Sequence, residues 1–123
     1  MKILLVDDSN TMRRIEKNTL EKMGYGEVHE ACDGADAIQK LGAGGFELVL
    51  MDWNMPNMTG IDALKAIKAN PALKSVPVIM VTSESEKSRI MEAIQAGAAN
   101  YVVKPFQPET LQEKISAVTK KPA

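Results

Sequence analysis

The chain is poor in several residue types, and each shortage excludes a class of protein. One cysteine, Cys32, occurs in 123 residues, so no disulfide can form within the chain. The apolar run at residues 3–6 is too short for a signal peptide or a membrane span. Lys and Arg number 15 against 16 Asp and Glu, so the basic surplus that binds nucleic-acid phosphates is missing. We therefore expect a cytoplasmic protein that binds neither nucleic acid nor a membrane.

Aromatic residues are also scarce, at 4%, so much of the core must consist of aliphatic side chains and Met. The fractions of hydrophobic and charged residues, 45% and 25%, are typical of a globular protein. No linker or low-complexity segment interrupts the chain. We expect a single domain over residues 1–123, without an output domain, in which Cys32 is a small buried hydrophobe and His29 lies at the surface or at a sheet edge.

Short apolar runs alternate with segments of helical periodicity along the whole chain. The runs cover residues 2–6, 27–32, 47–51, 77–82 and 100–104. Three of them are continuously apolar, which is typical of strands covered on both faces of a parallel sheet. The first helical segment carries Met12, Ile15, Leu20 and Met23 on one side, and Ser83 and Glu86 have the spacing of a capping box for the fourth helix. The pattern predicts an α/β fold of five βα units, with one parallel sheet and helices on both faces.

Polar side chains stand where the predicted strands end. Asp7 and Asp8 follow the first strand, Asp52 ends the third, Thr82 the fourth and Lys104 the fifth. Because the carboxyl ends of parallel strands share one edge of the sheet, and ligands bind there, we expect these side chains to meet in one cleft.

Three neighbouring carboxylates repel one another, so a cation is expected among them. One ammonium, from Lys104, does not balance the charge of three carboxylates. A hard divalent cation such as Mg²⁺, which takes oxygen ligands, is the natural complement. A carboxylate held in place beside Mg²⁺ and a lysine is suited to attack phosphorus, because phosphoryl transfer depends on alignment and charge neutralisation.

The segments LLVDDSNTMRRI, VLMDWNMPNMTG, VIMVTSE and YVVKPF carry these residues. Together they resemble the receiver domain of two-component response regulators, and within that family the chemotaxis regulators. The resemblance covers essentially the whole chain, with all motifs in order at strand ends. It implies a flavodoxin-like (βα)5 fold with strand order 2-1-3-4-5. It also implies a phosphoacceptor switch that assists its own phosphorylation and dephosphorylation, and not an enzyme in the usual sense.

The resemblance assigns a role to each residue of the predicted cleft. Asp52 is the phosphoacceptor, which a histidine kinase of the chemotaxis type phosphorylates. Asp8 binds Mg²⁺ directly and Asp7 does so largely through water, while Asp52 and the carbonyl of Asn54 complete the protein ligands. Further roles fall to Lys104, which contacts the phosphoryl group, to Thr82 and Tyr101, which move as a switch, and to Asn54 and Glu84, which tune the phosphoryl lifetime.

The same resemblance implies a partner surface on the fourth helix, fifth strand and fifth helix. It includes Lys87, Tyr101, Val103 and Lys114, and the flagellar motor switch is the expected partner. Ser9 stands where a well-studied branch of the family carries a bulky aromatic residue, which leaves contact with a dedicated phosphatase open. Arg13 and Arg14 are expected to form a solvated face that could also meet a kinase or phosphatase. We expect a monomer.

Alternatives remain at this point. The acidic pair could cap the helix that follows it, and Tyr101 and Lys104 could be a packing residue and a surface charge. The chain could serve as a phosphorelay intermediate or phosphate sink without any motor contact. A flavodoxin-type electron carrier has the same βα rhythm, but the acidic segment DDSNTM would repel a flavin phosphate.

Overall fold

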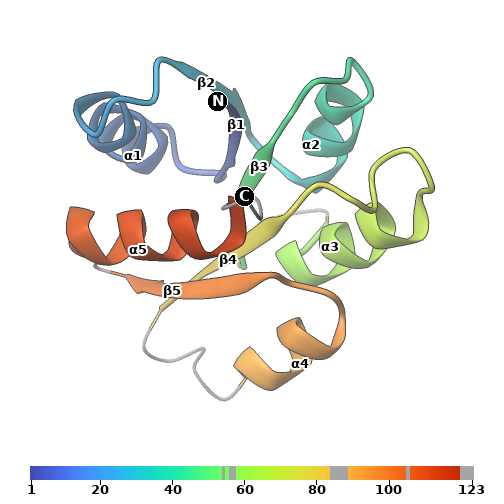
Figure 1. Cartoon of the computed structure of the whole chain (residues 1–123). Coiled ribbons are helices and arrows are strands. Elements are labelled where there is room, and N and C mark those ends of the chain that lie inside the picture. Colours follow the sequence, from blue (N-terminus) through green and yellow to red (C-terminus); the bar gives the residue numbers. More distant parts are fainter. Residues whose placement is uncertain (54, 56–57, 84–88, 105, 120–123) are drawn as a thin grey trace.

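The computed structural model describes residues 1–53, 55, 58–83, 89–104 and 106–119, and for Ser83, Lys104 and Thr119 it describes the backbone alone. Five strands alternate with five helices in these ranges (Figure 1). The strands are β1 (Lys2–Val6), β2 (Glu27–Ala31), β3 (Leu48–Asp52), β4 (Val78–Ser83) and β5 (Asn100–Lys104). The helices are α1 (Asn10–Lys22), α2 (Gly34–Leu41), α3 (Gly60–Ala69), α4 (Ile90–Gln95) and α5 (Pro108–Thr119).

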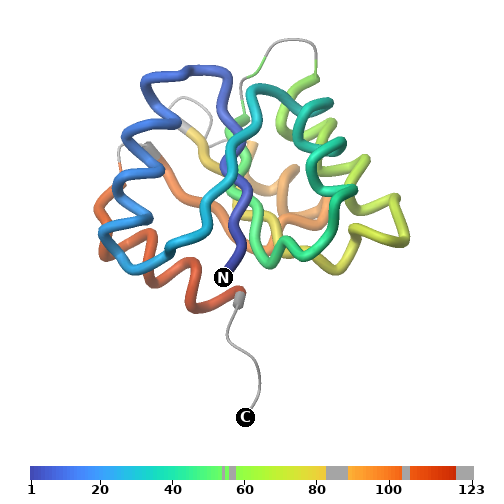
Figure 2. Tube along the Cα trace, turned by 90° about the horizontal axis from the view of Figure 1, so that it is seen from above, coloured from blue at the N-terminus to red at the C-terminus, as the bar shows by residue number. Residues whose placement is uncertain are grey.

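The strands form one parallel sheet in the order β2-β1-β3-β4-β5, which confirms the predicted flavodoxin-like topology. Helices α1 and α5 cover one face of the sheet, and α2, α3 and α4 cover the other (Figure 1). The view from above shows the same two layers on either side of the strands (Figure 2). Parallel strands need such crossover helices, and right-handed crossovers on both sides of a starting strand place helices on both faces.

Two apolar clusters fill the space between the sheet and its helices. Successive residues of β1 alternate between them, because successive side chains of a strand point to opposite faces. Ile3 and Leu5 pack in the cluster that Leu20 of α1 and Leu111 of α5 cover. Leu4 and Val6 pack in the cluster that α2, α3 and α4 cover. Burial on both faces explains why the central strands read as continuous apolar runs.

Three helices begin with a side-chain cap that the sequence provides at the required position. Ser9, Asp33 and Thr59 each accept a hydrogen bond from the backbone N–H three residues later. Such N-caps satisfy donors that have no partner within the helix. The cap of α1 is therefore Ser9, and the carboxylates of Asp7 and Asp8 do not serve as its N-cap.

The structure corrects several details of the sequence prediction. Helix α1 turns Glu16 and Leu20 into the protein, whereas Ile15 is 53% exposed. Helix α4 runs from Ile90 without a side-chain cap, and Ser83 ends β4, while Glu86, the other residue of the predicted capping box, lies outside the described part of the chain. Cys32 is exposed and not buried as predicted, because the chain leaves the edge strand β2 at Ala31.

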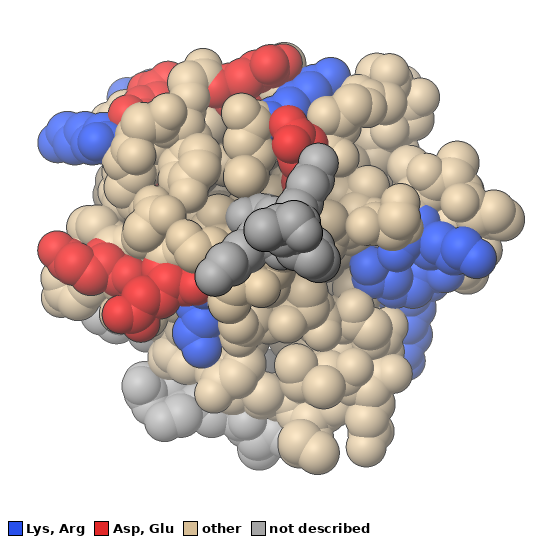
Figure 3. Space-filling view, in the orientation of Figure 1, with Lys and Arg blue, Asp and Glu red and all other residues tan. Residues whose placement is uncertain are grey.

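The surface carries charges of both signs. On the face in Figure 3, Lys and Arg side chains form separate small groups, as do Asp and Glu. His29 is exposed on the edge strand β2, as predicted. Within the described ranges, no helix has both the length and the apolar character needed to cross a lipid bilayer.

Candidate functional site

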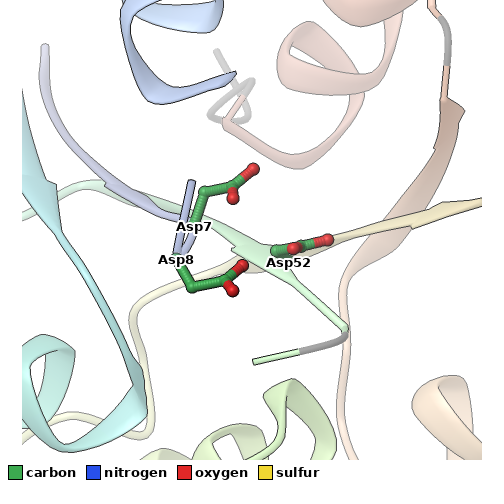
Figure 4. Close-up of side chains that lie close together, drawn as sticks. All are labelled: Asp7, Asp8 and Asp52. Atoms are coloured by element: carbon green, nitrogen blue, oxygen red, sulfur yellow. The ribbon is translucent and has the colours of Figure 1, made fainter. Parts of the chain in front are cut away.

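Three carboxylates meet at the carboxyl edge of the sheet. Asp7 and Asp8 directly follow β1, and Asp52 ends the neighbouring strand β3. One oxygen atom of each lies within 4.8 Å of the others, and the side chains reach toward one shared space (Figure 4). The parallel pairing of β1 with β3 produces this convergence, because it aligns Val6 with Met51 immediately before the acidic residues.

The three carboxylates differ in their exposure to solvent. Asp7 is buried, with 2% exposure, Asp52 is half-buried and Asp8 is exposed. The carboxylate of Asp7 accepts a hydrogen bond from the N–H of Ser9 at 2.9 Å, and its own N–H donates to the carbonyl of Ala31 at 3.2 Å. The acidic turn therefore has one anchored member, Asp7, and one member, Asp8, that is open to a ligand from solvent.

Arg13 supports this turn from the first part of α1. Its guanidinium donates to the backbone carbonyl of Asp7 and to the side-chain oxygen of Asn10, and it forms an ion pair with Glu30 on β2. The Arg13 side chain is only 12% exposed. The prediction of a solvated face is thus wrong for Arg13, whereas Arg14 is exposed as predicted.

Asp52 is fixed by the residues around it. Behind it Met51 is fully buried, and its carboxylate accepts a hydrogen bond from the N–H of Trp53 at 3.0 Å. Trp53 is itself buried, with 2% exposure, and the guanidinium of Arg89 lies 5.9 Å from the centre of its ring. The Asp52 side chain is therefore held between two buried residues and by one hydrogen bond.

Gly60 is a further site residue, which sequence reasoning missed as such. Its N–H donates to the carbonyl of Trp53 at 2.8 Å, so the start of α3 is tied to the end of β3. A Cβ at this position would lie 2.2 Å from the carbonyl oxygen of Asp52. The only signal in the sequence is that a glycine directly follows the N-cap Thr59.

Thr82 is buried next to the acidic cluster. It lies near the end of β4, which pairs with β3, and it is 1% exposed. Its hydroxyl has no hydrogen-bond partner among the residues that the structure describes. A buried hydroxyl that has a hydrogen-bond partner avoids a cost of about 1–3 kcal/mol.

The predicted partner surface is described in part. Tyr101 and Val103 on β5 are both half-buried. The ammonium of Lys114 on α5 lies 4.7 Å from the centre of the Tyr101 ring and 3.4 Å from the side-chain oxygen of Asn100. Of the other predicted residues, Asn54, Glu84 and Lys87 lie outside the described part of the chain, as does the side chain of Lys104.

The donor set of the acidic cluster fits a magnesium ion. Asp7, Asp8 and Asp52 supply only carboxylate oxygens, the ligands that hard divalent cations prefer. Two of the three are at least partly accessible, which leaves room for the water molecules that Mg²⁺ retains.

Three carboxylates that converge at the carboxyl edge of a parallel sheet of order 2-1-3-4-5 are typical of one class of signalling protein. The family model for the response regulator receiver domain matches residues 3–116, and the chain belongs to this family. It is a CheY-like response regulator of two-component signalling. Receiver domains are phosphoacceptor switches that bind Mg²⁺ at an acidic pocket.

Within the receiver family, this chain is similar to chemotaxis proteins. The chain is 52% identical to the chemotaxis protein CheY of Pseudomonas aeruginosa, over 96% of this chain and 95% of that protein. It is 51% identical to the chemotaxis protein CheY-3 of Vibrio cholerae, over 96% of this chain and 91% of that protein.

Solved structures show the same fold. The structure of CheY4 from Vibrio cholerae superposes with a TM-score of 0.86 at 38% identity and covers 95% of this chain and 97% of that chain. A putative response regulator from Chloroflexus aurantiacus superposes with a TM-score of 0.91 at 28% identity and covers 98% of each chain.

Proposed function

We propose that this chain, a single receiver domain over residues 1–123, transmits a chemotaxis signal from a CheA-like histidine kinase to the flagellar motor switch. Asp52 takes up the phosphoryl group, and the face formed by α4, β5 and α5 binds the motor switch once Asp52 is phosphorylated. The convergence of Asp7, Asp8 and Asp52 within 4.8 Å carries this proposal. We further propose that the protein works in the cytoplasm as a monomer and that a phosphatase is an additional partner.

In the proposed reaction, the covalent step on this protein takes place at Asp52. One oxygen of its carboxylate forms a bond to phosphorus, while the bond from phosphorus to the imidazole nitrogen of the kinase breaks and the electron pair leaves with that nitrogen. The N–H of Trp53 orients the carboxylate. Asp8, Asp7, Asp52 and the carbonyl of Asn54 would hold Mg²⁺, which neutralises charge on the transferring group when it is bound.

We assign Lys104 and Thr82 to the phosphoryl group after transfer. Lys104 ends β5 on the same edge of the sheet as Asp52, where an ammonium can pair with a phosphoryl oxygen. Thr82 has a buried hydroxyl that gains a hydrogen-bond acceptor when a phosphoryl oxygen arrives beside it. Asn54 and Glu84, which follow Asp52 and Thr82 by two residues, are assigned to the lifetime of the phosphoryl group.

The switch then reaches the partner surface through β5. Thr82 pairs with Val103, and Met80 of the same strand pairs with Tyr101, so a shift of β4 bears directly on both residues of the surface. In the structure Tyr101 is half-buried beneath the ammonium of Lys114. We propose that Tyr101 turns inward as Thr82 moves, and that Tyr101, Val103, Lys114 and Lys87 then present the altered surface.

The direct test measures binding of a motor-switch N-terminal peptide with and without beryllofluoride, which mimics a phosphoryl group on Asp52. We expect beryllofluoride to increase affinity by about 5- to 150-fold, the usual range of allosteric coupling. Absent binding, or binding that does not depend on beryllofluoride, would contradict the motor contact and favour the phosphate-sink alternative. Transfer of phosphoryl groups back to a histidine domain would support that alternative directly.

Thr82→Val should separate phosphorylation from output. The substitution keeps the shape of the side chain and removes a buried hydroxyl that has no partner among the described residues, so the free energy of unfolding should change by less than about 1 kcal/mol. The gain in peptide affinity on adding beryllofluoride should fall below about twofold, because the coupling free energy is lost. Thr82→Ser, which retains the hydroxyl, is the matched control and should keep most of the gain. Equal gains in the wild type and Thr82→Val would refute the role of the hydroxyl.

A further inference from the structure

Arg13 joins three elements at the base of the acidic cluster. Its guanidinium contacts the carbonyl of Asp7 after β1, the side chain of Asn10 on α1 and the carboxylate of Glu30 on β2, the last at 3.1 Å. Only 12% of the Arg13 side chain is exposed. The Arg13 guanidinium is therefore held by these three contacts and does not extend into solvent as the sequence predicts.

The Asp7 carbonyl is the contact through which Arg13 reaches the acidic turn. Strand β1 ends at Val6, and just beyond it the N–H of Asp7 donates to the carbonyl of Ala31 while the carbonyl of Asp7 accepts from Arg13. Asp7 is 2% exposed, and a buried carbonyl without a donor is unfavourable. Arg13 supplies the donor, and this contact fixes the peptide unit that joins Asp7 to Asp8.

We propose that Arg13 is a positioning residue for the cation site, acting through the Asp7 carbonyl to fix the turn that presents Asp7 and Asp8. This inference rests on the proposed function, since it assumes that Mg²⁺ binds between these carboxylates and Asp52. Arg13 does not touch the cation or the phosphoryl group. It limits the conformations of the acidic turn before the cation binds, and thereby raises the affinity for the cation.

The chemistry of the contacts explains why the residue is an arginine. A planar guanidinium can donate in several fixed directions at once, whereas an ammonium on a flexible stem cannot reproduce this fork. A positive charge beside the site would by itself oppose cation binding. Glu30 offsets that charge through its ion pair with Arg13, and Lys17 lies 3.7 Å from the same carboxylate.

Arg14 provides a matched control within the same helix. Its side chain is exposed and forms no hydrogen bond or ion pair with the residues that the structure describes. Removing its charge changes the electrostatic potential near the acidic cluster in the same direction as removing that of Arg13, without touching the acidic turn. The pair therefore separates the effect of geometry from the effect of charge.

The experiment compares Arg13→Lys and Arg13→Ala with Arg14→Lys and Arg14→Ala. Mg²⁺ affinity is measured by calorimetry and by Trp53 fluorescence, and thermal unfolding without Mg²⁺ reports stability. We expect Arg13→Ala to weaken Mg²⁺ binding by about tenfold, the range typical of residues that orient metal ligands, and Arg13→Lys to weaken it nearly as much. Both Arg14 variants should bind Mg²⁺ at least as tightly as the wild type does.

A kinetic readout distinguishes positioning from general damage. With acetyl phosphate as donor, the Arg13 variants should need more Mg²⁺ for half-maximal phosphorylation but reach the wild-type rate at saturating Mg²⁺. Unchanged Mg²⁺ affinity in both Arg13 variants, or equal losses in the Arg13 and Arg14 variants, would overturn the role of Arg13 while leaving the proposed function intact. If the wild type itself binds no Mg²⁺, the proposed function fails, and this inference fails with it.

Discussion

Asp52→Asn should abolish phosphoryl uptake from acetyl phosphate and leave the fold intact. The amide is nearly isosteric with the carboxylate but lacks the anionic oxygen that attacks phosphorus. The amide oxygen can still accept the hydrogen bond that the N–H of Trp53 now donates to the carboxylate. Intact-mass measurement in Mg²⁺ should show one labile phosphoryl adduct on the wild type and none on the variant.

Asp62→Asn is the matched control for this substitution. Asp62 is an exposed carboxylate in the first turn of α3, near the site but outside the cluster, and its variant should take up the phosphoryl group like the wild type. An adduct on Asp52→Asn as large as that on the wild type would refute the assignment of the phosphoacceptor. If the wild type forms no adduct although it binds Mg²⁺, beryllofluoride binding separates rapid turnover from a strict need for the kinase.

Gly60→Ala should damage both stability and phosphorylation, although alanine is the better helix former. The added Cβ would lie 2.2 Å from the carbonyl oxygen of Asp52 and 3.0 Å from the side chain of Met80. The first of these contacts is with backbone, so either β3 or the start of α3 must move. We expect the free energy of unfolding to fall by about 1–3 kcal/mol, as for other overpacked positions.

We expect Gly60→Ala to slow phosphorylation even in the molecules that remain folded. Displacing the carbonyl of Asp52 also displaces its carboxylate, and a shift of this kind slows phosphoryl transfer because the reaction depends on alignment. Chemical denaturation and the phosphorylation rate of the folded fraction measure the two effects separately. Gly26→Ala is the control, since a Cβ there meets nothing within 4 Å and should change stability by less than about 0.5 kcal/mol. A Gly60→Ala variant as stable and active as the wild type would contradict the close approach.

The sheet and the acidic cluster are predictable from sequence because both follow from short-range rules. Continuous apolar runs identify strands that are buried on two faces, and parallel connection brings their carboxyl ends to one edge. The βα rhythm therefore requires Asp7, Asp8 and Asp52 to approach one another. The order of the motifs at the strand ends also suffices to identify the family.

The orientation of α1 is not predictable in the same way. Neighbouring side chains of a helix point in directions about 100° apart, so the rotation of α1 about its own axis decides which of two neighbours is buried. Glu16 is buried and Ile15 exposed, and Arg13 is largely covered while Arg14 is exposed to solvent. The packing of α1 against the sheet sets this rotation, and no pattern within the helix reveals it. The close approach of Gly60 likewise depends on the path between β3 and α3.

The strand order gives the protein two functional halves that meet at β3. On one side, β1 and β2 carry the acidic turn and the Arg13–Glu30 pair, which under the two proposals above govern how readily Asp52 is phosphorylated. On the other side, β4 and β5 carry Thr82 and Tyr101, each one strand further from Asp52, at about 4.8 Å per strand. Substitutions in the first half should alter how readily a phosphodonor phosphorylates Asp52. Substitutions in the second half should alter how tightly the partner binds. Under the proposed function, cation affinity can then evolve without altering the partner surface, because neither β1 nor β2 carries a residue of that surface.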